Sequence, residues 1–304
     1  MISISVINSS LNSAFNSTMI EPTYRVFKGQ SLDYRACASI PKLWGDCVQP
    51  PHEHLRGIVG EGYCLAINEL SKWSLLLTRE INALLLESKI LARYKNPDLK
   101  DVYVFISTSE NWTPFGVHRD FEDSIILDID GLGRCIYEWP NENDVEFDFP
   151  IIDARSFMGI TFDYVDKLPF AQCVHLKNGE YHNVKSKVLH IFKSNGPGLF
   201  IGLSCVESRD GNVFIPPIYD PNLKANIKIL CRGRAKVALS SFKLEGGYIE
   251  TRYGRIKLTD EEKHRLLSKK FKFSKPVVLR ELISSKIESN LVEKMIKIGA
   301  VYVF

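Results

Sequence analysis

The stretch that most constrains the fold is a pair of apolar segments, DSIILDID and RCIYEW, joined by the turn Gly131-Leu132-Gly133. Both segments combine apolar residues with interspersed polar ones, which we interpret as strands with one buried face. Two such segments around a short glycine-containing turn predict a β-hairpin of half-buried strands. Side chains carried by this hairpin would sit on a rigid sheet.

Two potential metal ligands, His118 and Asp120, lie shortly before the first of these strands. Successive side chains of an extended chain point to opposite faces, so residues two apart point the same way. An imidazole and a carboxylate in this arrangement can share one ion. The H-x-D spacing alone is common by chance, and the strand that follows is what makes it a candidate site.

A third ligand is expected downstream, where the sequence offers His175, His182 and His190. We favour His190 because it follows a β-rich segment and precedes the apolar strand LFIGLS, which is reached through a glycine-rich turn at 195–198. Two histidines and one carboxylate leave coordination positions open, as in non-haem Fe(II) oxygenases. The sequence therefore predicts a catalytic metal site of His118, Asp120 and His190.

The segment HRDFEDSIILDIDGLGRCIYEW resembles the H-x-D segment of the JmjC and cupin-like oxygenases, the ribosomal-oxygenase type in particular. In that family the last iron ligand follows a glycine by eleven residues, and here His190 follows Gly179 by the same spacing. The resemblance covers roughly 101–204. It implies a double-stranded β-helix of the jelly-roll or cupin type that holds Fe(II) and uses 2-oxoglutarate and O₂.

The sequence departs from this family at the position that binds the distal carboxylate of 2-oxoglutarate. A Lys or Arg usually stands fifteen residues after the first histidine, and here that position is Gly133. The usual Pro and Gly before the last histidine are also replaced, by Lys-Ser-Lys at 185–187. Because an unpaired carboxylate is costly to bury, the cosubstrate needs another cation. The candidates are Arg119, Arg134, Lys185, Lys187 and Lys193.

Several neighbouring polar residues complete the predicted site. Four are candidates for holding the cosubstrate: Thr113, Ser124, Arg134 and Tyr137. Partners that orient the metal ligands are expected among Glu122, Asp123, Ser124 and Tyr137, because ligating side chains need such partners. Thr108, Ser109 and Thr113 could offer hydroxyls to a bound carboxylate, although a turn is the simpler interpretation.

Composition excludes some classes of protein. Hydrophobic content of 45% and charged content of 25% are typical of globular chains. No run of eighteen apolar residues predicts a membrane helix, and the N-terminus does not resemble a secretory signal, so a cytoplasmic location is expected. The seven cysteines show no C-x-x-C spacing and are interpreted as buried or incidental thiols. His52 and His54 form an H-x-H pair that we assign to a solvated turn rather than to zinc.

Three further segments have readable patterns. Apolar residues at helical spacing predict an amphipathic helix over 68–94, and DVYVFISTS predicts a strand leading to the metal segment. The segment 140–170 is acidic and aromatic, and its carboxylates Glu142, Asp144, Glu146 and Asp148 could attract a basic substrate, with a solvated loop as the alternative.

The C-terminal part differs in charge from the rest of the chain. Residues 224–304 hold 19 Lys and Arg against 8 Asp and Glu, a net charge of +11, whereas the remainder, with 20 against 28, carries −8. This asymmetry indicates a module that meets an anionic surface such as nucleic acid or a ribosome. Helices are predicted to start at Thr259, Ser274 and Asn290, with flanking strands YIETRYGRIKL and AVYVF, an order that resembles a winged helix.

Together these patterns predict an α+β chain in three parts. They are an oxygenase domain over 1–206, a connector or dimerisation segment over 207–247, and a winged-helix-like domain over 248–304. The predicted function is hydroxylation of an amino-acid side chain in a protein, peptide or amino-acid-derived substrate by an Fe(II)/2-oxoglutarate-dependent dioxygenase. The alternative is a catalytically lapsed cupin-like regulator with a basic winged helix. A homodimer is left open.

Overall fold

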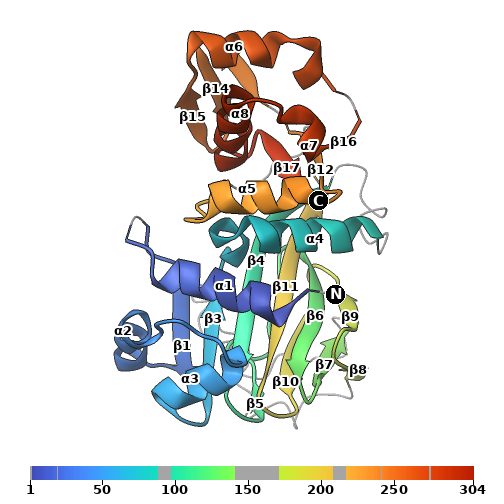
Figure 1. The fold of residues 1–304 in the computed structure, drawn as a ribbon. Helices are drawn as coiled ribbons and strands as arrows, with labels where there is room; N and C mark the ends of the chain where they lie inside the picture. The colour runs from blue at the N-terminus through green and yellow to red at the C-terminus, as the bar shows by residue number, and fades with distance from the viewer. Residues whose placement is uncertain are drawn as a thin grey trace. The chain divides into compact units, whose positions relative to one another are not determined.

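The computed structural model describes residues 2–18, 20–87, 97–140, 171–207, 217–240, 242–273 and 275–304. The chain forms two compact units (Figure 1). The barrel unit consists of Ala14–Leu70 and Lys100–Val206. The C-terminal unit consists of Met1–Ser13, Ser71–Leu99 and Glu207–Phe304. Each predicted domain boundary stays a prediction; in the structure, two N-terminal segments belong to the same unit as the C-terminal part.

The barrel unit is built from two antiparallel sheets. The larger sheet has, in spatial order, β2 (Ser31–Leu32), β1 (Tyr24–Lys28), β3 (Tyr63–Ile67), β4 (Pro97–Ser107), β11 (Gly198–Glu207), β6 (Asp123–Gly131) and β9 (Tyr181–Val184). The smaller sheet has β5 (Asn111–Trp112), β10 (Leu189–Ser194), β7 (Arg134–Trp139) and β8 (Gln172–Leu176). From β6 to β11 the chain crosses repeatedly between the two sheets, the winding of a double-stranded β-helix. The predicted core fold is confirmed.

The two strands around the glycine turn are present, but the predicted hairpin between them is wrong. β6 pairs with β11 and β9, whereas β7 pairs with β10 and β8, so the turn carries the chain from one sheet to the other. Gly133 has φ +78°, and a Cβ at this position would press against the Leu176 carbonyl oxygen. Both strands were predicted correctly, but most of their residues are buried on both faces and not on one face as expected, and an apolar segment does not determine which strand is its partner.

Aromatic side chains fill the space between the two sheets. The core cluster here includes Phe105, Phe192 and Phe200, and the rings of Phe105 and Phe200 stack at 4.8 Å between centroids. Fully burying a side chain of this kind contributes about 1.5–3 kcal/mol to stability. This packing supports the strands that carry the candidate site.

Two helices lie between β2 and β3 of the larger sheet along the chain. α2 (Tyr34–Leu43) begins at Asp33, whose carboxylate accepts from the backbone N–H groups of the next turn. α3 (Pro51–Val59) has Pro51 at its first position, where no N–H is needed. The H-x-H pair therefore lies in a helix and not in the predicted turn, because the two prolines preceding it start a helix. His54 contacts the Trp44 carbonyl oxygen at 2.6 Å, and His52 faces Asp130 at 3.1 Å.

The C-terminal unit packs helices around two small sheets. Its helices are α1 (Ile4–Phe15, which ends in the barrel unit), η1 (Leu70–Trp73, which begins there), α4 (Leu75–Glu87), α5 (Leu223–Arg232), α6 (Asp260–Leu267), η5 (Lys269–Phe271), α7 (Leu279–Leu282) and α8 (Lys286–Lys297). Its sheets are β16 (Val277–Val278), β12 (Lys236–Leu239) and β17 (Val301–Val303), and β13 (Lys243–Glu245), β14 (Tyr248–Thr251) and β15 (Gly254–Lys257).

The helix starts predicted in this unit are partly confirmed. Thr259 and Glu262 form the predicted capping box of α6. The last helix starts after Ser285 and not at Asn290, because the Ser285 hydroxyl accepts from the Glu288 N–H. The helix predicted from Ser274 is a short strand followed by α7. That this part forms a winged helix stays a prediction.

The predicted helix over 68–94 is a 3₁₀ turn followed by α4, and residues 88–94 of that prediction lie outside the described residues. The acidic segment 141–170 also lies outside them, including Glu142, Asp144, Glu146 and Asp148. Among the helices described here, none is long and apolar enough to cross a bilayer.

Candidate metal centre

His118, Asp120 and His190 come together between the two sheets of the barrel unit. The two histidines face each other in a short antiparallel bridge, where each backbone N–H donates to the other carbonyl at 3.0 and 2.9 Å. One carboxylate oxygen of Asp120 lies 3.5 Å from His118 Nε2, and the other lies 3.6 Å from His190 Nε2. Two ligands of one ion, each bonded at about 2.1 Å, lie at most about 4.2 Å apart, so these spacings fit a shared metal.

Backbone carbonyls fix the orientation of both imidazoles. His118 Nδ1 contacts the Gly116 carbonyl and His190 Nδ1 contacts the Val188 carbonyl, both at 2.9 Å. An Nδ1 that donates to a carbonyl leaves the lone pair on Nε2, the tautomer that binds a metal. His190 Nε2 is buried and makes no hydrogen bond to the residues described. An orphaned acceptor aimed at a second imidazole and a carboxylate is what a metal site requires.

The protonation states of the ligands also suit a metal. Burial raises the pKa of Asp120, but the neighbouring His118 and His190 and the hydrogen bond from Ser124 outweigh burial and hold the pKa below its usual value. Burial and the neighbouring His118 lower the pKa of His190 to about 4. At neutral pH the site therefore presents an ionised carboxylate and a neutral buried imidazole.

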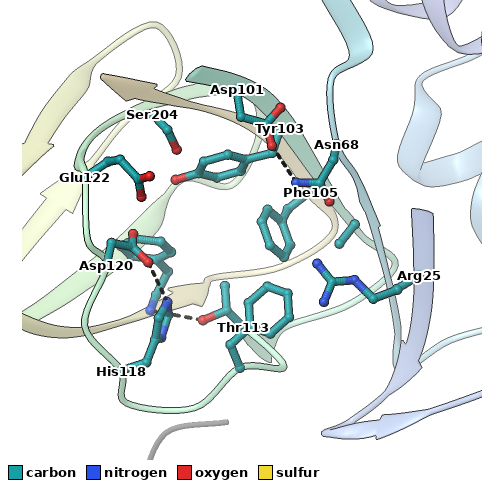
Figure 2. Close-up of a pocket in the computed structure, with 13 residues that line it drawn as sticks. Arg25, Asn68, Asp101, Tyr103, Phe105, Thr113, His118, Asp120, Glu122 and Ser204 are labelled. Atoms are coloured by element: carbon teal, nitrogen blue, oxygen red, sulfur yellow. Dashed lines mark hydrogen bonds and ion pairs between the residues drawn. The ribbon is translucent and has the colours of Figure 1, made fainter. Parts of the chain in front are cut away.

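A cavity of about 270 Å³ opens beside His118 and Asp120 (Figure 2). Alternate residues of β4, namely Asp101, Tyr103 and Phe105, face it. The remaining lining residues are Arg25, Ala66, Asn68, Thr113, Phe115, Glu122, Phe192 and Ser204. The cavity thus combines an aromatic floor with hydroxyl, amide, carboxylate and guanidinium groups at its edges, a composition typical of a small-molecule site.

Of the four residues predicted to hold a cosubstrate, two lie at the site. Thr113 lines the cavity, and the Ser124 hydroxyl donates to Asp120 Oδ2 at 3.0 Å. Tyr103 shares a hydrogen bond with Ser124, and Gly202 leaves room for its ring, because a Cβ there would overlap that ring. Ser124 therefore orients a metal ligand, one of the roles expected of it.

Arg134 and Tyr137 lie away from the cavity lining. The buried Arg134 donates from Nε to Asp128 at 2.6 Å and stacks over Phe200, with 4.1 Å from Cζ to the ring centroid. Its charge is already neutralised by Asp128. Tyr137 faces Trp112 at 5.3 Å between ring centroids, in the outer cluster of the smaller sheet.

The other candidate cations and histidines also have different neighbours. Lys185 pairs with Asp123 at 2.7 Å, and Lys193 pairs with Glu110 at 2.6 Å. Neither these lysines nor Arg119 and Lys187 line the cavity. His182 contacts the Glu138 carboxylate at 2.9 Å, so of the three downstream histidines only His190 joins the H-x-D pair.

Solved structures with a similar fold were found, although no family model and no curated protein matches the sequence. The chain is similar over 100% of its length to Escherichia coli YcfD, of which 92% is covered, with 10% identity and a TM-score of 0.48. A structure titled as the E. coli ribosomal oxygenase YcfD with cobalt and 2-oxoglutarate gives 10% identity, coverage of 100% and 90%, and a TM-score of 0.45. A cupin superfamily protein from Desulfitobacterium hafniense covers 35% of this chain and 67% of its own, at 9% identity and a TM-score of 0.23. These values assign no family, so the function rests on this chain's own site.

The residues that the larger sheet contributes to the cavity were not predicted from the sequence. Arg25 lies on β1, and Asn68 follows β3, both far in sequence from the H-x-D segment. Asp101, Tyr103 and Phe105 could have been found, because they alternate along a strand that was predicted to lead to the metal segment. Arg25 had no local signal, since its strand reaches the site only through the pairing of β1 with β3 and β3 with β4.

A second cluster of potential ligands, the thiol cluster, consists of Cys135, Cys173 and His175. Their ligand atoms all lie within 4.8 Å of one another. His175 Nδ1 is 3.1 Å from Cys135 Sγ, and His175 Nε2 is 3.7 Å from Cys173 Sγ. Cys135 is buried, as predicted for the cysteines, whereas Cys173 and His175 are exposed. Their proximity to one another was not predicted from the sequence.

Proposed function

We propose that this chain is an Fe(II)/2-oxoglutarate-dependent oxygenase that hydroxylates an amino-acid side chain. The observation that supports this most is the convergence of His118, Asp120 and His190 with an unpaired Nε2 beside an open cavity. Two imidazoles and one carboxylate leave open positions on an octahedral ferrous ion. Bound there, the ion would supply oxidation of a substrate C–H bond to C–OH by O₂, while 2-oxoglutarate is converted to succinate and CO₂.

The chain's own residues position the ligands and shape the cavity. The Gly116 and Val188 carbonyls hold both imidazoles with Nε2 toward the ion, and the Ser124 hydroxyl holds the carboxylate. The rings of Phe105 and Phe192, which line the cavity, keep water away from one side of the site. Such a preorganised arrangement needs no reorganisation of the ligands when the metal binds.

The polar edge of the cavity supports an amino-acid substrate. Glu122 lines it next to Asp120, and Asp101 lines it on β4. The Asp101 carboxylate accepts from the Asn68 side chain at 2.6 Å and from the Glu69 N–H at 2.7 Å, which leaves Glu122 as the carboxylate for a cationic or hydrogen-bonding substrate group. The proposed substrate is a protein, a peptide or an amino-acid derivative.

A second candidate function is suggested by the charge of the C-terminal part. Its net charge of +11 favours binding to nucleic acid or ribosomal surfaces, with the barrel as a lapsed regulatory domain. Such binding should weaken steeply as salt is raised, and affinity that is flat from 50 to 200 mM salt (about the range over which counterion release is marked) argues against it. Binding of this kind is also compatible with the oxygenase, as a means of delivering a substrate. The homodimer and the cytoplasmic location stay predictions.

Succinate formation tests the proposed reaction. Protein loaded anaerobically with Fe(II) is given 2-oxoglutarate and then O₂, and succinate is measured against time. The expected result is slow, metal-dependent succinate formation even without a substrate, lost in Asp120→Ala and kept in Glu110→Gln. Glu110 is a matched control because its carboxylate pairs with Lys193 and does not line the cavity. Iron uptake without any succinate formation would contradict the proposal.

A further inference from the structure

We infer that Arg25 binds the distal carboxylate of 2-oxoglutarate and so selects the cosubstrate. The inference rests on the proposed function, because it assigns the second end of a ligand whose first end lies at the metal. It assigns the cation that binds the cosubstrate to β1, a strand outside the H-x-D segment. Four observations carry it: the place of Arg25 in the cavity, its missing partner, the engagement of the other cations, and the walls around it.

Arg25 reaches the cavity through the register of the larger sheet. It pairs with Ala66 on β3, and Ala66 pairs with Phe105 on β4, so the three form one row across the sheet. All three line the cavity. Figure 2 shows Arg25 and Asp120 on opposite sides of it, with the Phe105 ring between them in this view. The guanidinium and the metal ligands thus line the same cavity, so one bound molecule has access to both.

The Arg25 guanidinium is partly buried and forms no ion pair with any carboxylate in the part of the chain that the structure describes. Its closest described contact is the Phe115 ring, with Cζ 5.0 Å from the centroid. Asp101 is the nearby acid, but it forms no ion pair with Arg25 among the described residues and accepts instead from Asn68 and the Glu69 N–H. Burial lowers the pKa of Arg25. Withdrawing a cation from water without a partner is costly, so this arrangement fits an arginine that receives an anion from outside the chain.

The other cations considered from the sequence do not compete for this role. Arg25 is the only Lys or Arg among the described residues that line the cavity. Arg134 is neutralised by Asp128 and stacked on Phe200, whose ring stacks in turn on Phe105 at the cavity wall. Gly133 cannot be replaced by a larger residue without a clash with Leu176. The position fifteen residues after His118 is thus closed to a basic side chain in this chain.

The surroundings of Arg25 match a short dicarboxylate. Phe105 and Phe115 pack edge to face at 5.6 Å between centroids, and both rings line the cavity that the guanidinium and the metal ligands share. Phe115 also contacts His118 at 6.0 Å between centroids. In 2-oxoglutarate bound in this way, the two methylene groups would lie along these rings. The keto acid end would lie at the metal and the distal carboxylate at Arg25. An arginine can bind that carboxylate through two parallel hydrogen bonds.

Binding measurements on the metal-loaded protein test the inference. Binding of 2-oxoglutarate to the Fe(II) protein is followed anaerobically by its visible absorption band, alongside 2-oxopentanoate, which has the same length without the distal carboxylate. The variants are Arg25→Gln and Arg25→Lys, and the control is Lys193→Gln, which removes a cation outside the cavity. The amount of Fe(II) bound by each variant shows that the site is folded.

The expected result is a loss of about 100-fold in 2-oxoglutarate affinity in Arg25→Gln, the usual size for removing one partner of a buried charge pair. Affinity for 2-oxopentanoate and for Fe(II) should stay the same, Arg25→Lys should recover part of the loss, and Lys193→Gln should match the unmodified protein. Equal 2-oxoglutarate affinity with and without Arg25 would overturn the inference alone. Loss of substrate hydroxylation with unchanged 2-oxoglutarate affinity would assign Arg25 to the substrate and also overturn it. An unmodified Fe(II) protein that binds no 2-oxoglutarate would overturn the proposed function itself.

Discussion

The barrel unit holds two clusters of three potential metal ligands that differ in how they are supported. In each cluster the ligand atoms lie within 4.8 Å of one another. His190 is fully buried between the sheets, whereas His175 is exposed on the smaller sheet. The ligand atoms are therefore close together in both clusters, and the clusters differ in the orientation of their side chains and in their access to water.

Orientation separates the two clusters. Both imidazoles of the buried cluster use Nδ1 to contact a backbone carbonyl and aim Nε2 at a common point with Asp120. His175 instead lies between two thiols, with one ring nitrogen toward each. The buried cluster has its ligands fixed before any metal arrives, while the thiol cluster would have to turn its ring. Preorganisation of the ligands is what distinguishes a metal centre from a chance grouping.

The largest effect is expected from breaking the buried cluster. His190→Ala removes one of three ligands and leaves Asp120 and His118 around an empty space. We expect Fe(II) affinity to fall by at least about 100-fold, the upper end of the loss caused by removing a partner that merely orients a ligand. Isothermal titration under anaerobic conditions measures this. Unchanged stoichiometry and affinity would show that the ion binds elsewhere.

A smaller effect is expected from removing the support of one ligand. Ser124→Ala deletes the hydroxyl that donates to Asp120 but keeps all three ligands. Loss of such a partner usually costs about 10- to 100-fold in metal affinity. The same titration measures it, with Ser109→Ala as a control because that hydroxyl contacts the Glu110 carbonyl instead. An Fe(II) affinity equal to that of the control would mean that Asp120 is fixed by other contacts.

The pH dependence of the metal-free protein should also reflect the burial of His190. Its folded pKa is lowered to about 4 by burial, so the unfolded chain takes up a proton near pH 6.5 that the folded protein resists. The contribution of His190 to the free energy of unfolding is therefore fully present above pH 6.5 and is lost as the pH falls toward 4, a loss on the order of 1–3 kcal/mol. Urea unfolding at several pH values measures this, and His190→Gln should flatten the dependence. An identical pH dependence in that variant would contradict the assignment.

The smallest effect is expected at the thiol cluster. Partial loss of contact with water and the nearby Cys135 raise the pKa of the Cys173 thiol, so this thiol keeps its proton and is a poor metal ligand at neutral pH. Cys173→Ser should leave Fe(II) content and succinate formation unchanged. Elemental analysis of the loaded variant provides the check. Reduced iron in Cys173→Ser would mean that the two clusters are not independent.

The sequence predicted the metal ligands better than the cavity around them. The H-x-D spacing and the turn before LFIGLS are local signals, and the strand that follows the H-x-D segment and the two strands around the turn are confirmed. The predicted pairing of β6 with β7 was wrong, because an apolar segment indicates a strand but does not indicate which strand lies next to it. Arg25 and the thiol cluster depend on contacts between strands far apart in sequence, such as Cys135 with His175 in β7 and β8. Long-range register is the information that the sequence pattern does not contain.

The position of a bound metal tests the central claim most directly. Crystals grown with Mn(II) in place of Fe(II) and with 2-oxoglutarate can be examined by anomalous scattering. The account predicts one peak between His118 Nε2, His190 Nε2 and the Asp120 carboxylate, with the open side of the ion toward the cavity that Arg25 lines. A peak at Cys135, Cys173 and His175, or none at the two histidines and the aspartate, would contradict it.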